Sequence, residues 1–334
     1  MINKRQFLRA SCGSAALMLT GTASGYANFS QLLPKDKYSR RARALGTDIV
    51  LTVFHHDKSL AELAVKDALN KVEHVEQLMS IYRPESQLST LNREGVLRHP
   101  HPDFLAVLYK AQKLSELTQG AFDITVQPLW KLYVDHSRRG TLPSEVEISK
   151  VRSRVGWQHL HLTDDLIHMN KGGVQITLNG MAQGLAADFA QQALKNRGIQ
   201  HALIDAGEFN AMGQPEERKA WHIAIKHNRQ QNERLCKTSL SDRCLSTSGD
   251  YGTRFSEDYR HHHLFDPRTG FSPTQLSSVS VAAPSALEAD ALSTALFVLG
   301  TEKGMKLIES MDQVDAMFVD KSGHVEQTQG FSVL

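Results

Sequence analysis

The segment "EADALSTALFVLG", residues 288–300, predicts a helix that lies in the interior of a domain. Its alanine, leucine, phenylalanine and valine side chains surround the helix axis, as in helices that are buried on every side. Asp290 and Thr294 break this pattern, and they share one face because they stand four residues apart. A buried carboxylate is unfavourable unless it is paired or binds a metal. The two oxygen-bearing side chains suit Mg²⁺ or Ca²⁺ rather than zinc, whereas the alternative is an Asp290 that caps a neighbouring loop.

The composition is that of an ordinary globular protein. Of the 334 residues, 41% are hydrophobic and 22% are charged, which is enough for a large core. The formal net charge is +2, and it becomes −1 without residues 1–27, which contain Lys4, Arg5 and Arg9 and no acid. A nearly neutral chain without a basic patch does not favour binding to nucleic acid.

Residues 1–27 have the features of an export signal. The basic start "NKRQFLR" precedes a weakly apolar stretch, and small residues suited to cleavage end at Ala27. The run from Lys4 to Leu8 is similar to a twin-arginine signal in which Lys replaces the first Arg. The apolar stretch is too short to span ~30 Å of hydrocarbon. We therefore expect an exported protein that is soluble after cleavage, with an uncleaved membrane anchor as the alternative.

The rest of the chain predicts a polar lead-in at residues 28–40 and one mixed α/β domain at about 41–334. A strand from Ile49 to Phe54 precedes a helix at 59–79, which Ser59 and Glu62 begin as a capping box. A strand–helix–strand unit is expected over 173–213. The other expected elements are a helix at 103–118, a polar insertion at 135–145, strands at 220–227, 234–247 and 276–283, and a C-terminal hairpin.

Glycines and cysteines leave two questions open. The segment "NGMAQG", residues 179–184, begins a helix between two glycines, and a helix N-terminus of this kind favours an anion. Close packing of the helix against its neighbours explains the glycines equally well. Cleavage after Ala27 would leave Cys236 and Cys244, which form a disulfide only if their Cα atoms lie within bridging distance.

Two polar segments near the C-terminus carry further candidate residues. The segment "STSGDYGTRF", residues 246–255, contains Asp250, and "HHHLFDPRTGF", residues 261–271, contains His263. The "DPRTG" portion predicts a β-turn in which Asp266 caps backbone N–H groups. If the three histidines are extended, neighbouring side chains alternate and cannot converge on one ion, so His262 faces away from His263 and should be replaceable.

Six segments occur together in an order and spacing that belong to one family. They are "YRPESQLSTLN", "GAFDITVQPLW", "NGMAQGLAAD", "STSGDY", "HLFDPRTG" and "EADALSTALFVLG". With these segments the chain resembles the FAD:protein FMN transferases, or ApbE-type flavin transferases, from about Leu45 to the C-terminus. The resemblance implies an α+β fold, a single ApbE-like domain with mixed or antiparallel sheets flanked by helices.

The resemblance also implies an activity. Members of the family transfer FMN from FAD to a Ser or Thr hydroxyl of an acceptor protein and release AMP, with Mg²⁺ bound at the diphosphate of FAD. The implied partners are FAD and a periplasm-facing, membrane-attached acceptor, and the implied location is the periplasm. FAD pyrophosphatase activity at the same site is one alternative. A non-catalytic periplasmic protein that binds or delivers flavin is the other.

The resemblance assigns roles to particular residues. Asp290, Thr294 and the backbone carbonyl of Ala182 would bind the metal. His263 would accept a proton or stabilise phosphate, with Asp250 beside it as a second catalytic candidate. The remaining implied contacts, to the flavin nucleotide, are Leu45, Tyr82, Ala121, Phe122, Asp123, Asn179, Gln183 and Phe265.

Several positions depart from the pattern of the family. Gln183 stands where a Lys is common, Thr177 where an Asp is, and Asn179 where a Gly is. Glu208 and Phe209 occupy a loop that is often built from glycine. The loss of a cation near a diphosphate predicts weaker affinity or a changed choice of acceptor.

Overall fold

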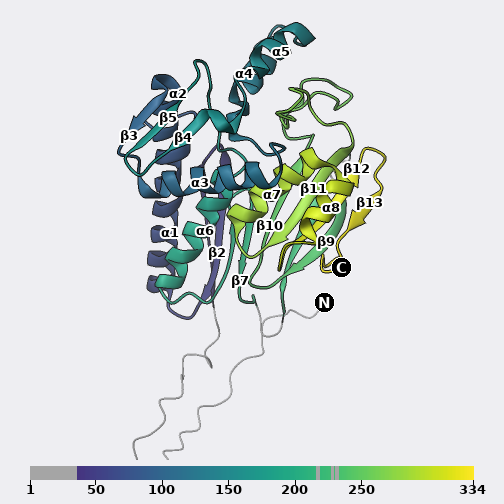
Figure 1. Ribbon diagram of the computed structural model, residues 1–334. Coiled ribbons are helices and arrows are strands. Elements are labelled where there is room, and N and C mark those ends of the chain that lie inside the picture. The colour runs from purple at the N-terminus through teal and green to yellow at the C-terminus, as the bar shows by residue number, and fades with distance from the viewer. Residues whose placement is uncertain (1–35, 216–218, 227–228, 230–232) are drawn as a thin grey trace, which may run out of the picture. The chain divides into compact units, whose positions relative to one another are not determined.

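The computed structural model describes residues 36–215, 219–226, 229 and 233–334 (Figure 1). The predicted export signal at residues 1–27 and the beginning of the lead-in lie outside this part. Among the described residues, none of the helices combines the length and the apolarity needed to cross a lipid bilayer.

An eight-stranded sheet forms the centre of the fold, in the order β1-β2-β6-β7-β10-β11-β12-β13. Every neighbouring pair is antiparallel, which confirms the α+β fold class. The strand β1 begins five residues before the expected domain start, so residues 36–40 belong to the sheet and not to a lead-in. The strands are β1 (Asp36–Ala44), β2 (Thr47–His55), β6 (His201–Asp205), β7 (Phe209–Met212), β10 (Cys244–Gly249), β11 (Leu276–Ala283), β12 (Asp315–Asp320) and β13 (Val325–Gln327).

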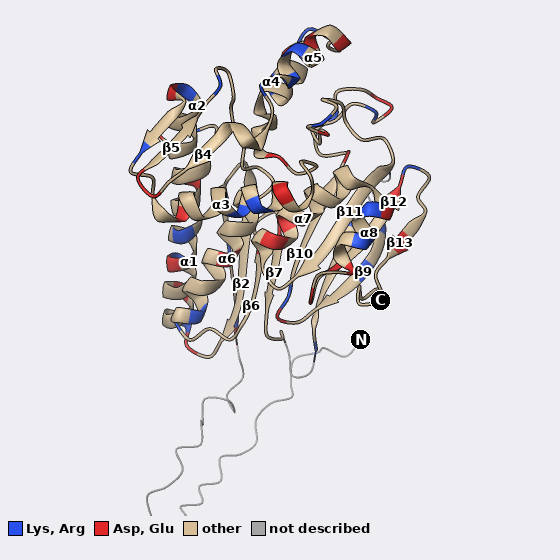
Figure 2. Ribbon diagram, in the orientation of Figure 1, with Lys and Arg blue, Asp and Glu red and all other residues tan. Residues whose placement is uncertain are grey.

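Four helices cover one face of this sheet: α1 (Lys58–Met79), α6 (Ala182–Asn196), α7 (Ala286–Leu299) and α8 (Thr301–Ile308) (Figure 1). The helix α7 packs against both β10 and β11, and α6 lies between α7 and α1. Eleven of the fourteen residues of α7 are buried, which confirms the expected interior helix. The strands beneath it, β7, β10 and β11, contain no charged residue, as their tan colour in Figure 2 shows.

A separate hairpin, β8 (Trp221–Lys226) with β9 (Arg234–Leu240), packs on the opposite face of the sheet. Its alternating buried residues, beginning with Trp221, meet Met317 and Val319 of β12. The expected strand 234–247 is therefore two strands in different sheets, separated by a turn in which Asp242 has a φ of 50°. Cys236 joins the hairpin core and Cys244 the core beneath the helices, and both are free thiols.

The remaining elements lie beyond one end of the sheet, where Figure 1 places α2 to α5 and a small three-stranded sheet. The helices α4 and α5 enclose the expected polar insertion and have a core of their own around Tyr133 and Phe265. The elements are α2 (Gln87–Glu94), β3 (Val96–Arg98), α3 (Pro102–Leu117), α4 (Gln127–Ser137), α5 (Glu145–Arg152), β4 (Leu160–Leu162), β5 (Leu166–Met169) and two 3-10 turns, Ile124–Val126 and Trp157–His159.

Two expectations about local structure were wrong. Residues 173–178 form no strand, because the side chain of Asn92 makes both backbone hydrogen bonds of Ile176, to its N–H at 2.6 Å and its carbonyl at 2.8 Å. The alternating apolar side chains of this segment are nevertheless buried, so their alternation in the sequence indicated burial and not the pairing of a β-strand. The cap of α1 is Asp57, which accepts from the Leu60 N–H, and not Ser59.

Candidate active site

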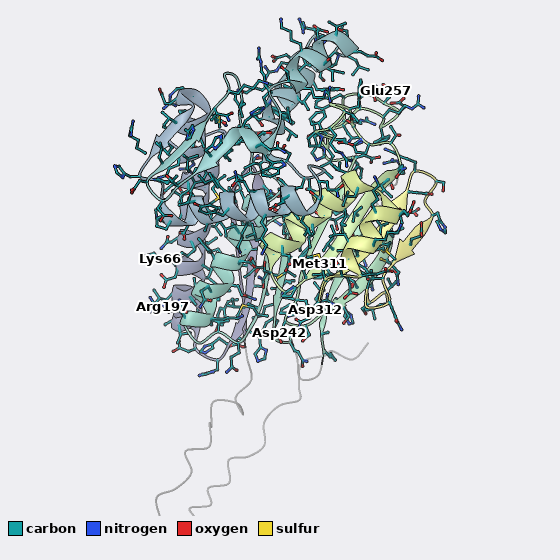
Figure 3. The ribbon with its side chains drawn as sticks, viewed as in Figure 1. Lys66, Arg197, Asp242, Glu257, Met311 and Asp312 are labelled. Atoms are coloured by element: carbon teal, nitrogen blue, oxygen red, sulfur yellow. The ribbon has the colours of Figure 1, made fainter. Side chains whose placement is uncertain are left out.

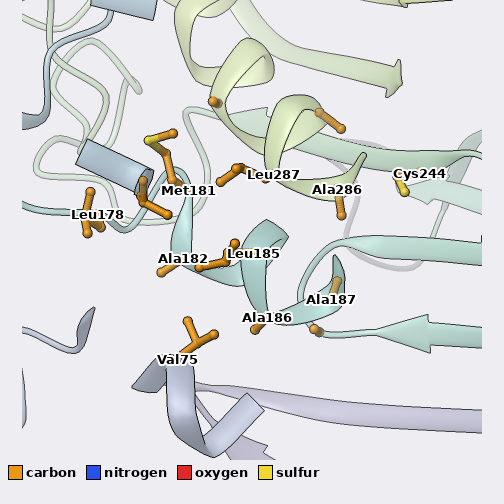
Figure 4. Close-up of a cluster of buried hydrophobic side chains, with 14 of the residues drawn as sticks. Val75, Leu178, Met181, Ala182, Leu185, Ala186, Ala187, Cys244, Ala286 and Leu287 are labelled. Atoms are coloured by element: carbon orange, nitrogen blue, oxygen red, sulfur yellow. The ribbon is translucent and has the colours of Figure 1, made fainter. Parts of the chain in front are cut away.

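The crossing of α6 over α7 positions the carboxylate of Asp290. A Cβ on Gly184 would lie 2.3 Å from the carbonyl oxygen of Ala286, so only glycine permits this approach. The N–H of Gly184 donates to Oδ2 of Asp290 at 3.1 Å. Figure 4 shows the start of α6, with Leu185 labelled, directly against the start of α7. Close packing, one of the two explanations for the glycines of "NGMAQG", is therefore what Gly184 provides.

The other predicted metal ligands lie at the same crossing. A Cβ on Gly180 would stand 3.0 Å from Oγ1 of Thr294, so the backbone before α6 touches this hydroxyl. Ala182, the first residue of α6, lies in the chain between Gly180 and Gly184, the two glycines that contact this crossing. The structure thus places the start of α6 beside Asp290 and Thr294.

The carboxylates at this crossing are poorly compensated. Burial raises the pKa of Asp290 to about 7, and the charge of Asp188 adds to the shift, against the Gly184 hydrogen bond. Burial and the charge of Asp290 raise the pKa of Glu208 well above its usual value. The Ser246 hydroxyl and the Thr247 N–H oppose this rise in the pKa of Glu208, but its buried Oε2 has no hydrogen-bond partner among the described residues. A bound cation would compensate these carboxylates.

The residues present fit a divalent cation such as Mg²⁺. The donors are carboxylate and hydroxyl oxygens together with a backbone carbonyl, which are the ligands that hard cations prefer. Gln183, which stands in place of a common Lys, lies over Gly207 and supplies no charge. Glu208, which occupies a loop often built from glycine in the family, places a second carboxylate beside Asp290.

Asp188 fixes the start of α7, a role that the sequence did not indicate. Its Oδ1 accepts from the Ala286 N–H at 2.8 Å and its Oδ2 from the Leu287 N–H at 3.0 Å. Asn210 donates to the same carboxylate at 3.2 Å. Because Asp188 comes from α6, about a hundred residues earlier, no local pattern around residue 286 could reveal this cap.

Leu45, one of the expected flavin contacts, is held by Glu76, and Glu76 pairs with Arg83, the residue after the expected contact Tyr82. The N–H of Leu45 donates to Oε1 of Glu76 at 3.0 Å, and Oε2 of Glu76 accepts from Arg83 at 2.8 Å. Leu45 itself has a φ of 52° in the turn between β1 and β2. Tyr82 is 67% exposed, so its ring is free to stack on a ligand.

The other expected flavin contacts differ in exposure. Asp123 is buried, and its carboxylate accepts from the N–H and hydroxyl of Thr125 and from the Trp157 N–H, at 2.6 to 2.8 Å. Burial nevertheless raises its pKa. Phe265 packs on Tyr133 with ring centroids 5.0 Å apart. Ala121 and Phe122 are also buried, whereas Asn179 is exposed.

Asp250 is fully enclosed and paired with two cations. Its two oxygens accept from Arg229 at 2.8 and 2.7 Å, and Oδ2 also accepts from Lys321. The Arg229 guanidinium in turn lies 3.9 Å from the ring centre of Tyr259. Both carboxylate oxygens are thus occupied by charged donors, so Asp250 is placed to anchor its loop.

His263 is available for proton transfer. Its Nδ1 lies 3.3 Å from both the backbone N and O of Thr253, and a Cβ on Gly252 would lie 2.9 Å from its Cε1. Burial lowers its pKa, opposed by the Thr253 hydrogen bond and the charge of Asp250. The imidazole is therefore neutral near pH 7 and can accept a proton.

The three histidines do not form the extended strand on which the expectation that His262 is replaceable was based. The histidines lie in a loop with a single bridge between Arg254 and His262, and His262 is completely buried. Its Nε2 bonds the Pro273 carbonyl at 3.0 Å, and its ring meets Phe297 of α7 edge-on at 5.4 Å. Burial lowers its pKa to about 4.

The predicted turn at Asp266 is confirmed. The Gly270 N–H donates to the Asp266 carbonyl, and the Arg268 N–H donates to Oδ1 of Asp266.

A cluster of His74, His101 and Asp103 stands apart from these residues. His74 Nε2 lies 2.9 Å from Oδ2 of Asp103, and His101 Nδ1 accepts from the Asp103 N–H as the cap of α3. The N-terminus of a helix carries partial positive charge, which opposes a cation. This cluster is accounted for as a helix cap with a hydrogen bond between His74 and Asp103.

Known proteins share both the sequence pattern and the fold. The model of the ApbE family matches residues 45–318. The chain belongs to the ApbE family. A relative from Salmonella typhimurium, named FAD:protein FMN transferase, is 31% identical, and the match covers 91% of this chain and 90% of the relative. A relative of the same name from Treponema pallidum is 29% identical, and the match covers 88% of this chain and 87% of the relative.

A solved structure agrees with the ApbE fold described above. The apo form of Pseudomonas stutzeri flavinyl transferase ApbE is 29% identical, with a TM-score of 0.78. The match covers 89% of this chain and 96% of that chain. The ApbE family membership and the α+β architecture are thus supported by sequence and by structure alike.

Proposed function

We propose that this chain transfers FMN from FAD to a Ser or Thr hydroxyl of an acceptor protein and releases AMP. Flavin transfer follows from its family, whose relatives are named FAD:protein FMN transferase. The observation that carries the metal-dependent form of this reaction is the α6–α7 crossing, where Asp290, Thr294 and Ala182 meet beside the unpartnered oxygen of Glu208.

Asp290, Thr294 and the Ala182 carbonyl would hold Mg²⁺, which would neutralise charge on the diphosphate of FAD. Tyr82 offers an exposed ring for stacking on the substrate. Because attack on a phosphoanhydride depends mainly on position and on charge, residues that orient the two substrates provide most of the rate.

His263 supplies the proton acceptor. The acceptor hydroxyl oxygen forms a bond to the FMN phosphorus, and the bond from that phosphorus to the bridging oxygen breaks. AMP leaves with the bridging oxygen, and the hydroxyl proton passes to the neutral His263 imidazole. Asp250 positions the loop that carries Gly252 and so supports His263, without acting as a base.

The test combines the full chain with FAD, Mg²⁺ and Ser- or Thr-containing candidate acceptors, and follows acceptor mass and AMP. A gain equal to FMN, with AMP released and EDTA abolishing both, is the expected result. AMP with free FMN would establish a pyrophosphatase. FAD binding without either product would establish a flavin-binding protein.

We place this reaction in the periplasm, on an acceptor attached to the membrane. Support comes from the sequence of residues 1–27 alone, with its basic start and its small residues before the expected cleavage site. Fusing residues 1–30 to a reporter tests the placement, because a reporter that stays in the cytoplasm would contradict it.

A further inference from the structure

A line of hydroxyl groups runs from the metal ligand Thr294 to the backbone of α7. Oγ1 of Thr294 lies 3.1 Å from Oγ of Ser248, which lies 2.8 Å from Oγ of Ser293. Ser293 donates to the backbone carbonyl of Asp290 at 2.9 Å, and its oxygen is also 3.2 Å from Ser246. Ser246 and Ser293 are buried, so the protein itself supplies their partners.

The directions of these hydrogen bonds follow from the carbonyl end of the line. A hydroxyl has one hydrogen to donate, and a carbonyl only accepts. Ser293 donates its hydrogen to the Asp290 carbonyl. Ser248 is therefore the donor in its hydrogen bond with Ser293.

The same reasoning fixes the hydroxyl of Thr294. Because the one hydrogen of Ser248 points to Ser293, Ser248 can only accept from Thr294. Thr294 thus donates its hydrogen to Ser248, and the lone pairs of its oxygen face away from β10. A hydroxyl binds a cation through a lone pair, so this orientation is the one that a metal ligand needs.

We propose that Ser248 and Ser293 are positioning residues that orient the Thr294 hydroxyl toward the metal. This inference rests on the proposed metal site and extends it to side chains on a second element. Groups that orient the ligands of a metal typically change its affinity by about 10–100-fold when they are removed.

The strand β10 offers a matched control on its other face. Ser246 and Ser248 face α7, whereas Thr247 between them bonds Ser280 of β11 at 2.8 Å. Ser280→Ala therefore removes a buried hydroxyl and its hydrogen bond from the same strand pair, away from the line. It leaves the metal ligands and their partners intact.

The experiment measures Mn²⁺ and Mg²⁺ binding to the metal-free full chain by calorimetry, without FAD or an acceptor. Ser248→Ala should weaken binding by about 10-fold, whereas Ser248→Thr, which keeps the hydroxyl, and Ser280→Ala should bind like the wild type. Melting temperatures in EDTA should be alike for Ser248→Ala and Ser280→Ala, because each variant loses one hydroxyl.

The outcomes separate this inference from the proposed function. Wild-type affinity in Ser248→Ala, or an equal loss in Ser280→Ala, overturns the positioning role while the metal site stands. If the wild type and Asp290→Ala bind the metal alike, the proposed metal site falls and the inference with it.

Discussion

Two buried aspartates, Asp250 and Asp290, differ in the groups that they contact. Asp250 accepts from both nitrogens of the Arg229 guanidinium and from Lys321. Asp290 accepts from the Gly184 N–H and is surrounded by the carboxylates of Asp188 and Glu208. Two cationic side chains compensate the negative charge of Asp250. The neighbouring carboxylates make a negative charge on Asp290 less favourable.

This difference supports a structural role for Asp250 and the proposed ligand role for Asp290. A compensated buried charge anchors the elements that it joins, here β10, β12 and the loop before β9. An uncompensated one is unfavourable in isolation and persists where a bound cation completes it. The family pattern predicted a metal ligand at Asp290 and a catalytic residue at Asp250, and the surroundings of Asp250 favour a structural role instead.

The largest effect is expected at the uncompensated aspartate. Asp290→Ala should lower Mg²⁺-dependent flavin transfer by about 10³-fold or more, because the variant loses the charged ligand that holds the metal at the diphosphate. The fold should remain, as far-ultraviolet circular dichroism would show. Transfer at the wild-type rate would end the distinction between the two aspartates.

His263→Ala should lower turnover by about 10²–10³-fold, within the usual range for a lost proton acceptor. FAD affinity, measured separately by fluorescence quenching, should change far less. The matched control is His222→Ala, since His222 is exposed on β8. Similar turnover in both variants would exclude His263 from the mechanism. His262 is unsuitable as a control because it is buried.

Asp250→Asn should act on stability. The change leaves Arg229 and Lys321 without their charged partner, and it should lower the free energy of unfolding by about 2–3 kcal/mol, below the full range for a buried pair because both cations are partly exposed. Urea unfolding measures the effect. Turnover per folded molecule should fall much less than in His263→Ala, and a larger fall would restore Asp250 as a catalytic base.

Gly184→Ala tests the crossing that positions Asp290. The added Cβ would lie 2.3 Å from the Ala286 carbonyl, so α6 and α7 must separate, at about 1–3 kcal/mol in unfolding free energy. Metal affinity should fall with it, because the Gly184 N–H moves away from Asp290. Gly172→Ala, where a Cβ would meet open space, is the control that should leave both quantities unchanged.

The smallest effect is a pH dependence of the metal-free protein. The pKa of Asp290 is raised from 3.8 to about 7, so the folded state keeps a proton that the unfolded chain releases. Stability should therefore decrease as the pH rises from about 4 to about 7. Asp290→Asn removes this dependence, because its side chain does not titrate.

Melting curves in EDTA at pH 5 and pH 7.5 measure this dependence in both proteins. The asparagine variant should gain about 2–5 °C on the wild type between these two pH values. A difference that does not change with pH would show that Asp290 is compensated in the same way as Asp250. The lowered pKa of His262 destabilises both proteins equally at low pH and cancels in the comparison.

The two ends of α6 differ in what they contact. Arg197, labelled in Figure 3, follows the last residue of α6 and pairs with Asp67 of α1 at 2.7 Å on the surface. The glycines at the other end of α6 touch α7. An ordinary exposed ion pair and the candidate metal site thus occupy two ends of one helix.

The sequence by itself determined the elements that depend on local pattern. The apolar residues of 288–300 require an interior helix, and the four-residue spacing places Asp290 and Thr294 on one face. The alternation of β2 and β8 and the turn at Asp266 are likewise encoded by adjacent residues. Ordered segments spread over most of the chain identified the family, since their joint occurrence is specific even where each is short.

Only the tertiary structure decided what each polar group meets. The partners of Asp250, Asp290 and Glu208 come from distant parts of the chain, as does the Asn92 side chain that replaces a strand neighbour at residue 176. Ser246 and Ser248 contact hydroxyl groups of α7, and only the packing of α7 on β10 brings these groups together. Burial and hydrogen-bonding depend on these approaches in space, and a linear pattern of residue types does not contain them.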